Sequence, residues 1–165
     1  MRLSSSFIFT CILLIVFLQF NSHSQTVQSE IKNLSEGADI ILTGKVITQN
    51  SAWNKEGSRI FTNVVIQAEE YIKGDYIEKT IVLTTPGGEV GEIGELYSHV
   101  PRFSTDEEVL LFVKKDKKSN NFTVFDGESG KISLYNDKTT GEKVTSRNKK
   151  ITTLKSEIKN YVDKQ

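Results

Sequence analysis

Few residues in this chain could carry out covalent chemistry. It has one cysteine, Cys11, and two histidines, His23 and His99. A Ser-His-Asp arrangement would have to run through His99, because His23 lies in a segment that we expect to be removed. No serine stands in a Gly-x-Ser-x-Gly elbow. We therefore expect His99 to be a partly exposed loop residue and the chain to lack a catalytic site.

The sequence also offers few of the residue patterns that bind metal ions. A zinc site needs several histidine or cysteine ligands, and these are missing after residue 24. Carboxylates near the middle of the chain could offer oxygens to calcium, but no calcium-loop motif accompanies them; they are Glu89, Glu92, Glu95, Asp106, Glu107 and Glu108. Any two of the acidic residues could form the carboxylate pair that glycoside hydrolysis requires. We predict neither a metal nor a cofactor.

Recognition is the better-supported chemistry. Trp53, Tyr97 and Phe103 fall in predicted loops, and Arg102 precedes Phe103. Aromatic residues and arginine are favoured at the centres of interfaces, so these four form the predicted partner surface. The alternative is that Phe103 and Trp53 plug the barrel ends. Four further phenylalanines occupy apolar strand positions, where core packing is expected in place of a stacking platform; they are Phe61, Phe112, Phe122 and Phe125.

The amino terminus has the layout of a secretory signal peptide. Arg2 gives a basic start, residues 7–20 are mostly apolar, and residues 21–24 are small and polar. Ser22 and Ser24 suit a cleavage before Gln25. An uncleaved membrane anchor is the alternative, but a spanning helix needs about 20 apolar residues. We expect a secreted or periplasmic protein with no membrane insertion after cleavage.

The remaining 141 residues have the length of one domain and no cysteine for a disulfide. Without Arg2 the chain holds 20 basic and 21 acidic residues, a net charge of −1. This balance gives no electrostatic reason to expect nucleic acid or an anionic membrane as partner. Local basic clusters at residues 114–118 and 147–150 are interpreted as a hairpin turn and a linker.

The apolar pattern predicts many short strands between two helices. A helix over residues 27–36 should stop at Gly37, and a strand from Asp39 should bulge or bend at Gly44. Residues 50–58 are interpreted as a polar connection. Further strands are expected at residues 60–71, 80–85, 96–100, 109–113 and 122–125, with a hairpin of 132–135 and 143–145. Residues 87–95 are interpreted as a glycine-rich loop with unusual backbone angles.

An amphipathic helix should close the chain. Leu154, Ile158, Tyr161 and Val162 share one helical face, and Thr152 or Thr153 could cap its start. Together these elements predict a mainly β fold: a small antiparallel OB-type barrel over residues 25–150 and a helix over 151–165 packed on or near it. Residues 1–24 form the predicted signal peptide.

The order of several segments resembles a largely uncharacterised family of secreted bacterial proteins. The segments are Ala38-Asp39 leading into the first strand, Lys73-Gly74 after the second, Thr84 to Gly88, Pro101-Arg102-Phe103 and Glu108 to Phe112. The order is also similar, more distantly, to the netrin-like module of tissue inhibitors of metalloproteinases. That resemblance implies an OB-type barrel and an exported location. The inhibitors' amino-terminal cysteine has no counterpart after residue 24, so no inhibitory residue carries over.

We therefore predict an exported, non-catalytic interaction module whose partner is another extracytoplasmic protein. The alternatives are a protease inhibitor acting through loop 86–103, a small hydrolase, or a carrier with a ligand inside the barrel. An apolar interior pocket of roughly 300 Å³ or more would indicate a carrier.

Overall fold

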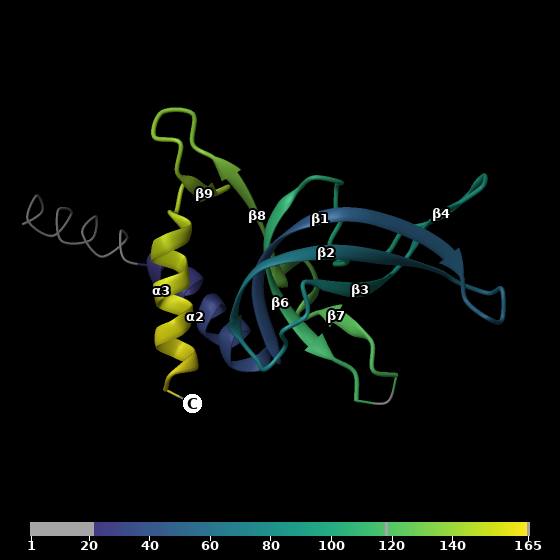
Figure 1. The fold of residues 1–165 in the computed structure, drawn as a ribbon, viewed down its shortest axis with the longest axis horizontal. Helices are drawn as coiled ribbons and strands as arrows, with labels where there is room; N and C mark the ends of the chain where they lie inside the picture. The colour runs from purple at the N-terminus through teal and green to yellow at the C-terminus, as the bar shows by residue number, and fades with distance from the viewer. Residues whose placement is uncertain (1–21, 118, 165) are drawn as a thin grey trace, which may run out of the picture. The chain divides into compact units, whose positions relative to one another are not determined.

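A closed barrel of five strands forms the main structural unit. The computed structural model describes residues 22–117 and 119–164. Five strands follow one another around the wall, and the last, β6, pairs with β1 to close it (Figure 1). In wall order they are β1 (Ile40–Trp53), β2 (Ile60–Lys73), β3 (Thr80–Pro86), β7 (Phe122–Val124) and β6 (Glu108–Lys115). The expected mainly β barrel is confirmed.

The sheet is mixed, which corrects the expectation of a wholly antiparallel barrel. Strands β3 and β7 run parallel and are joined through Leu83 and Phe122. The other four contacts in the wall are antiparallel. The chain leaves β3, forms the segment before β6, and returns through β7 beside β3. Such a crossover, and not a tight turn, is what parallel neighbours require.

The chain forms further strands and helices besides the five strands of the barrel. Strand β8 (Lys131–Asn136) pairs with β6 and with β9 (Lys143–Thr145), as the expected hairpin. A separate hairpin consists of β4 (Gly88–Val90) and β5 (Ile93–Glu95), and a 3-10 turn, η1, spans Gly127–Gly130. The helices are α2 (Ser22–Gly37) and α3 (Ile151–Val162).

The chain divides into two units, Met1–Asn33 and Leu34–Gln165. The described part of the first unit, residues 22–33, is helical, and the barrel belongs to the second. Most of the predicted signal peptide, residues 1–21, lies outside the described residues. Neither described helix has the length and apolar character needed to span a membrane.

The bend predicted at Gly44 is confirmed. The β1–β2 register shifts between Thr43 and Gly44, and again between Val46 and Thr48. A Cβ atom on Gly44 would lie 2.4 Å from the backbone oxygen of Gln67, so the two strands approach more closely than any side chain allows. The irregularity lies in the first half of β1, which pairs with β2 on one side and β6 on the other.

Alternate side chains of these strands fill the barrel. The residues of this inner core share complete or nearly complete burial; they are Ile40, Leu42, Val46, Val64, Ile66, Ile81, Leu83, Phe103, Val109, Leu111 and Val113. Residues between them, such as Ile41, Leu110 and Phe112, are buried as well. The buried central strand predicted at 109–113 is therefore confirmed. Phe61, Phe122 and Phe125 are only half-buried.

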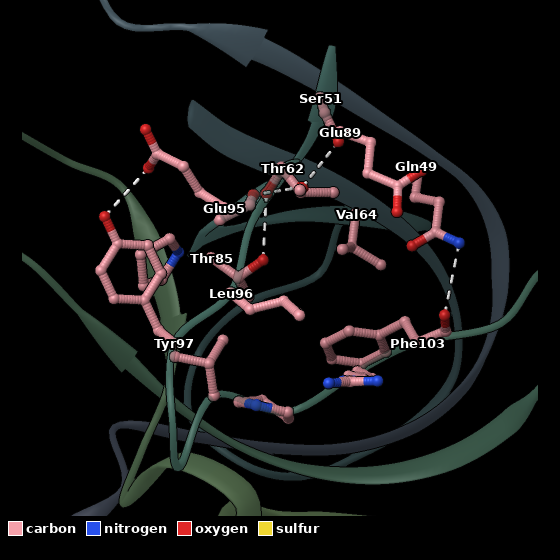
Figure 2. A pocket seen from close by; sticks show the side chains of 16 residues that line it. Gln49, Ser51, Thr62, Val64, Thr85, Glu89, Glu95, Leu96, Tyr97 and Phe103 are labelled. Atoms are coloured by element: carbon pink, nitrogen blue, oxygen red, sulfur yellow. Dashed lines mark hydrogen bonds between the residues drawn. The ribbon is translucent and has the colours of Figure 1, made fainter. Parts of the chain in front are cut away.

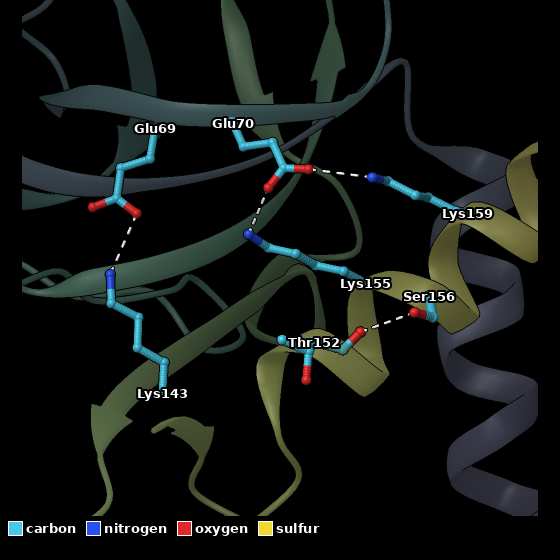
Figure 3. Close-up of polar contacts among 7 residues, drawn as sticks. All are labelled: Glu69, Glu70, Lys143, Thr152, Lys155, Ser156 and Lys159. Carbon is cyan, nitrogen blue, oxygen red and sulfur yellow. Dashed lines mark hydrogen bonds and ion pairs between the residues drawn. The ribbon is translucent and has the colours of Figure 1, made fainter. Parts of the chain in front are cut away.

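Helix α3 packs against β2 and β9. It buries Ile151, Leu154 and Ile158, and Glu70 of β2 accepts hydrogen bonds from Lys155 at 2.7 Å and Lys159 at 3.3 Å (Figure 3). The hydrogen bond from Lys155 is the largest influence holding the pKa of Glu70 below its usual value. The helix is joined to the barrel wall by apolar packing and by this ion pair.

The predicted cap of α3 is wrong. The helix begins at Ile151, so Lys150 occupies the cap position, and it makes no side-chain capping bond. Thr152 and Thr153 lie inside the first turn.

Three other boundaries differ from expectation. Strand β1 continues through the predicted polar connection to Trp53, because its inward positions stay paired with β2 although their side chains are polar. The glycine-rich segment is a β-hairpin, and residues 96–100 form no strand. Helix α2 begins at Ser22, five residues before the predicted start.

Candidate functional site

A pocket of about 400 Å³ opens at one end of the barrel (Figure 2). Its inner wall comes from β1, β2 and β3, and its outer wall from the segment between β3 and β6. The strands contribute Gln49, Ser51, Thr62, Val64, Thr85 and Pro86, and the segment contributes Gly87, Gly88, Glu89, Glu95, Leu96, Tyr97, Val100, Pro101, Arg102 and Phe103.

The pocket arises where the barrel interior changes from apolar to polar. Along β2 the inward residues run from Ile66 through Val64 to Thr62, and along β3 from Leu83 to Thr85. On β1 the irregularity after Val46 resets the alternation, so that Gln49 and Ser51 face the pocket. Side chains with hydrogen-bonding groups thus occupy positions that hold Val, Ile and Leu deeper in the barrel.

Glycines let the outer wall approach this polar rim. Gly88 has φ 131°, and a Cβ atom there would lie 2.3 Å from the hydroxyl oxygens of both Ser51 and Thr62. Gly87 has φ 87°, and a Cβ atom there would lie 2.6 Å from the backbone oxygen of Glu95. Residues with side chains rarely adopt such φ values. The predicted unusual backbone of this segment is confirmed, and it seats the β4–β5 hairpin on the barrel mouth.

A hydrogen-bond network fixes the pocket walls. Thr62 donates to the backbone oxygen of Gly87 at 2.7 Å, and Ser51 and Thr62 share a bond of 2.8 Å. Thr85 donates to the backbone oxygen of Thr62 at 3.3 Å. One oxygen of Glu95 accepts from the Tyr97 hydroxyl at 2.9 Å and from a backbone N–H of β2 at 3.1 Å. These bonds tie the hairpin and the segment after it to the strands.

A buried ion pair holds the other side of the pocket. Lys131 of β8 donates to Glu107 and to the backbone oxygen of Arg102, both at 2.6 Å, and its ammonium lies 5.1 Å from the centre of the Phe103 ring. Ser133 also donates to Glu107, at 2.6 Å. The Lys131 and Glu107 side chains are only 12% and 17% exposed. This pair therefore positions Arg102 and Phe103 at the pocket.

The Glu107 carboxylate is kept ionised by its donors. Burial raises its pKa, but hydrogen bonds from Lys131, Ser133 and the backbone N–H of Ser104 outweigh that effect, so the pKa lies below its usual value. The anchor is therefore complete at neutral pH.

The structure brings three of the four predicted partner-surface residues to this pocket. Tyr97 and Arg102 are exposed at it, whereas Phe103 is 8% exposed and belongs to the inner core. Trp53 does not line the pocket; it ends β1 and is 39% exposed. Phe103 therefore belongs both to the core and to the pocket lining, whereas Trp53 lies at the end of β1 outside the pocket. A binding role for these residues stays a prediction.

His99 and the acidic residues considered for calcium binding do not form a common site. His99 lies in an exposed loop with φ 63°, and its backbone oxygen accepts a hydrogen bond from Glu128. Three of the six acids considered for calcium are instead paired with different lysines: Asp106 with Lys45, Glu107 with Lys131, and Glu108 with Lys143. Within residues 22–117 and 119–164, no three potential metal ligands come together.

Sequence reasoning missed the polar inner wall, namely Gln49, Ser51, Thr62 and Thr85. Thr62 and Thr85 each lie two positions from a buried apolar residue of the same strand. Because strand side chains alternate between the two faces, this spacing predicts that both threonines point inward. No such signal existed for Gln49 and Ser51, because the irregularity in β1 changes the phase.

Comparison with known proteins does not identify the chain. No protein-family model matches the sequence, and no curated protein is significantly similar to it.

Proposed function

We propose that this chain is an exported, non-catalytic interaction module that binds another extracytoplasmic protein at the open end of an OB-type, netrin-like barrel. The observation that carries the proposal is the 400 Å³ pocket, whose size falls in the range of recognition sites. Five strands closing in the order β1-β2-β3-β7-β6 support the OB-type assignment. The signal-like residues 1–24 support export.

The character of the pocket favours a protein over a small apolar ligand. Its inner wall is mostly polar, and its outer wall carries exposed Leu96 and Tyr97 at 79% and 37% exposure. Exposed aromatic and aliphatic side chains beside a hydrogen-bonding cavity suit a protein interface, because aromatic residues and arginine are enriched there.

The test is capture of partners by the full chain. The protein, tagged at its carboxyl terminus and expressed in its own cells, is recovered from outside the cytoplasm with its bound proteins. The variant Tyr97→Ala/Arg102→Gln should lose a partner that the wild type retains. Its mass should show the loss of residues 1–24.

The matched control is Tyr135→Ala/Arg59→Gln, which makes the same changes at exposed positions that do not line the pocket. It should keep the partner. If both double variants capture the same proteins as the wild type, the pocket is not the binding surface and the proposal is wrong.

Protease inhibition through segment 86–103 is a second candidate. It is favoured by the β4–β5 hairpin, which projects from the barrel (Figure 1) and exposes Ile93 at its end. In that case Ile93→Ser would abolish capture of a protease, while Tyr97→Ala/Arg102→Gln would preserve it.

A further inference from the structure

The internal hydrogen bonds of the pocket commit the protons of its four hydroxyl side chains, those of Ser51, Thr62, Thr85 and Tyr97. A hydroxyl group has one proton to donate and an oxygen that can still accept. Thr62 gives its proton to Gly87, so the bond between Ser51 and Thr62 must be donated by Ser51. Thr85 and Tyr97 also donate into the protein. All four hydroxyl protons are therefore committed to bonds within the protein, and toward a ligand these hydroxyl groups can only accept.

The amide and carboxylate groups add further acceptors. Gln49 donates one N–H to the backbone oxygen of Phe103 at 3.3 Å, which leaves its second N–H and its side-chain oxygen for a ligand. Glu95 uses one carboxylate oxygen for its two internal bonds and keeps the other. Glu89 lies beside Gln49 at the opposite side of the pocket from Tyr97 (Figure 2) and brings a second carboxylate.

These two carboxylates have no basic partner in the parts of the chain that the structure describes. A protein docking over the pocket would remove water from them. Glu95 would keep its two internal hydrogen bonds, but burying two carboxylates without a cation beside them is costly. Arg102, at the Phe103 side, is the one cation among the described residues that line the pocket. Its guanidinium can meet a carbonyl or carboxylate of the partner, but it leaves an excess of one negative charge.

We infer that the pocket receives a basic side chain, lysine or arginine, from the partner protein. Such a side chain brings only donors, which complements a site of acceptors. Its aliphatic stem would lie on the apolar floor made by Val64 and Phe103, and its charged end would reach the carboxylates. This inference rests on the proposed function and specifies its chemistry.

A capped Gly-Lys-Gly peptide is the direct probe. Added to the full chain, it should shift the backbone amide resonances of Ser51, Thr85 and Gly88 in a saturable way. The same peptide with an acetylated lysine keeps the length and loses the charge, and it should cause no such shifts. Equal responses to the two peptides, or none to either, would overturn the inference.

The decisive variant is Glu89→Gln, since the Glu89 carboxylate makes none of the hydrogen bonds that build the pocket. It should weaken binding of the lysine peptide by about tenfold, the scale of one charge-assisted hydrogen bond. Glu92→Gln makes the same change on the same hairpin at a residue that does not line the pocket, and it should bind as the wild type does. If both variants weakened peptide binding equally, the cause would be the net charge of the protein, and a specific contact with Glu89 would be contradicted.

Partner capture separates this inference from the proposed function. If Tyr97→Ala/Arg102→Gln abolishes capture but Glu89→Gln leaves it unchanged, the pocket binds a partner without a basic side chain, and only the present inference fails. If neither variant changes capture, both proposals fail.

Discussion

Thr43 is an exception among the buried residues. It lies on β1, is 2% exposed, and its hydroxyl finds no hydrogen-bond partner among the described residues. A buried hydroxyl without a partner loses its bonds to water and gains nothing in return. The barrel wall therefore carries a local cost at this position.

Replacing Thr43 with valine should stabilise the protein. Valine keeps the branched shape and removes the unpaired oxygen, so we expect the free energy of unfolding to rise by about 1 kcal/mol. Urea unfolding should show a higher midpoint with an unchanged slope. Thr48→Val, at an exposed position of the same strand, should leave the midpoint nearly unchanged; a lower midpoint for Thr43→Val would contradict this account.

At the scale of elements, segment 102–107 depends on one anchor in β8. Glu107 and Lys131 hold Arg102 and Phe103 at the pocket, and both side chains are largely buried. Because the pKa of Glu107 is lowered in the folded state, the unfolded chain binds more protons in acid. The resulting stability is present above the ordinary pKa of 4.5 and is lost as the pH falls through the lower, folded-state pKa.

Glu107→Gln should remove this dependence. We expect a loss of about 2 kcal/mol at pH 7 and a smaller further decrease between pH 5 and lower pH than in the wild type. Chemical unfolding across that range measures both. Glu56→Gln, in the exposed β1–β2 turn, should keep the wild-type profile. An acid-induced loss of the same size in Glu107→Gln would show that other carboxylates account for it.

Sequence periodicity predicted the strands of the core well and the pocket poorly. Residues 60–71, 80–85 and 109–113 have apolar patterns that match their burial, so the sequence alone was enough to place these strands. The far half of β1 could not be placed in this way, because its alternating residues are all polar or exposed and its phase changes after Val46. The hairpin at 88–95 was hidden by its glycines, which predict an irregular backbone but do not reveal that two short strands pair.

Closure of the barrel requires β1 to pair with both β2 and β6, and Gly44 lies in the part of β1 that does so. Because Gly44 has no side chain, its backbone can lie close to the backbone oxygen of Gln67 in β2. We therefore expect the packing of the whole barrel wall to be sensitive to this position.

Gly44→Ala should therefore destabilise the barrel as a whole. The added methyl group overlaps backbone, which cannot rotate away, so we expect a loss of about 2–4 kcal/mol in the free energy of unfolding. Thermal unfolding followed by far-UV circular dichroism measures it. Gly94→Ala serves as the control, since its Cβ atom would lie 3.4 Å from the flexible Glu89 side chain. Equal melting temperatures for the two variants would refute the role given to Gly44.

Strands β3 and β7 pair at a single position, Leu83 with Phe122, so the pairing around the barrel wall is uneven. Elsewhere each strand is paired with its neighbour at three or more positions, so we expect local opening of the barrel wall to occur first between β3 and β7. Strand β3 forms one side of this contact with β7 and also supplies Thr85 to the pocket. We therefore expect a bound partner to slow amide hydrogen exchange along β3, including at residues that it does not contact. Local opening between β3 and β7 would also set how readily the pocket changes its width.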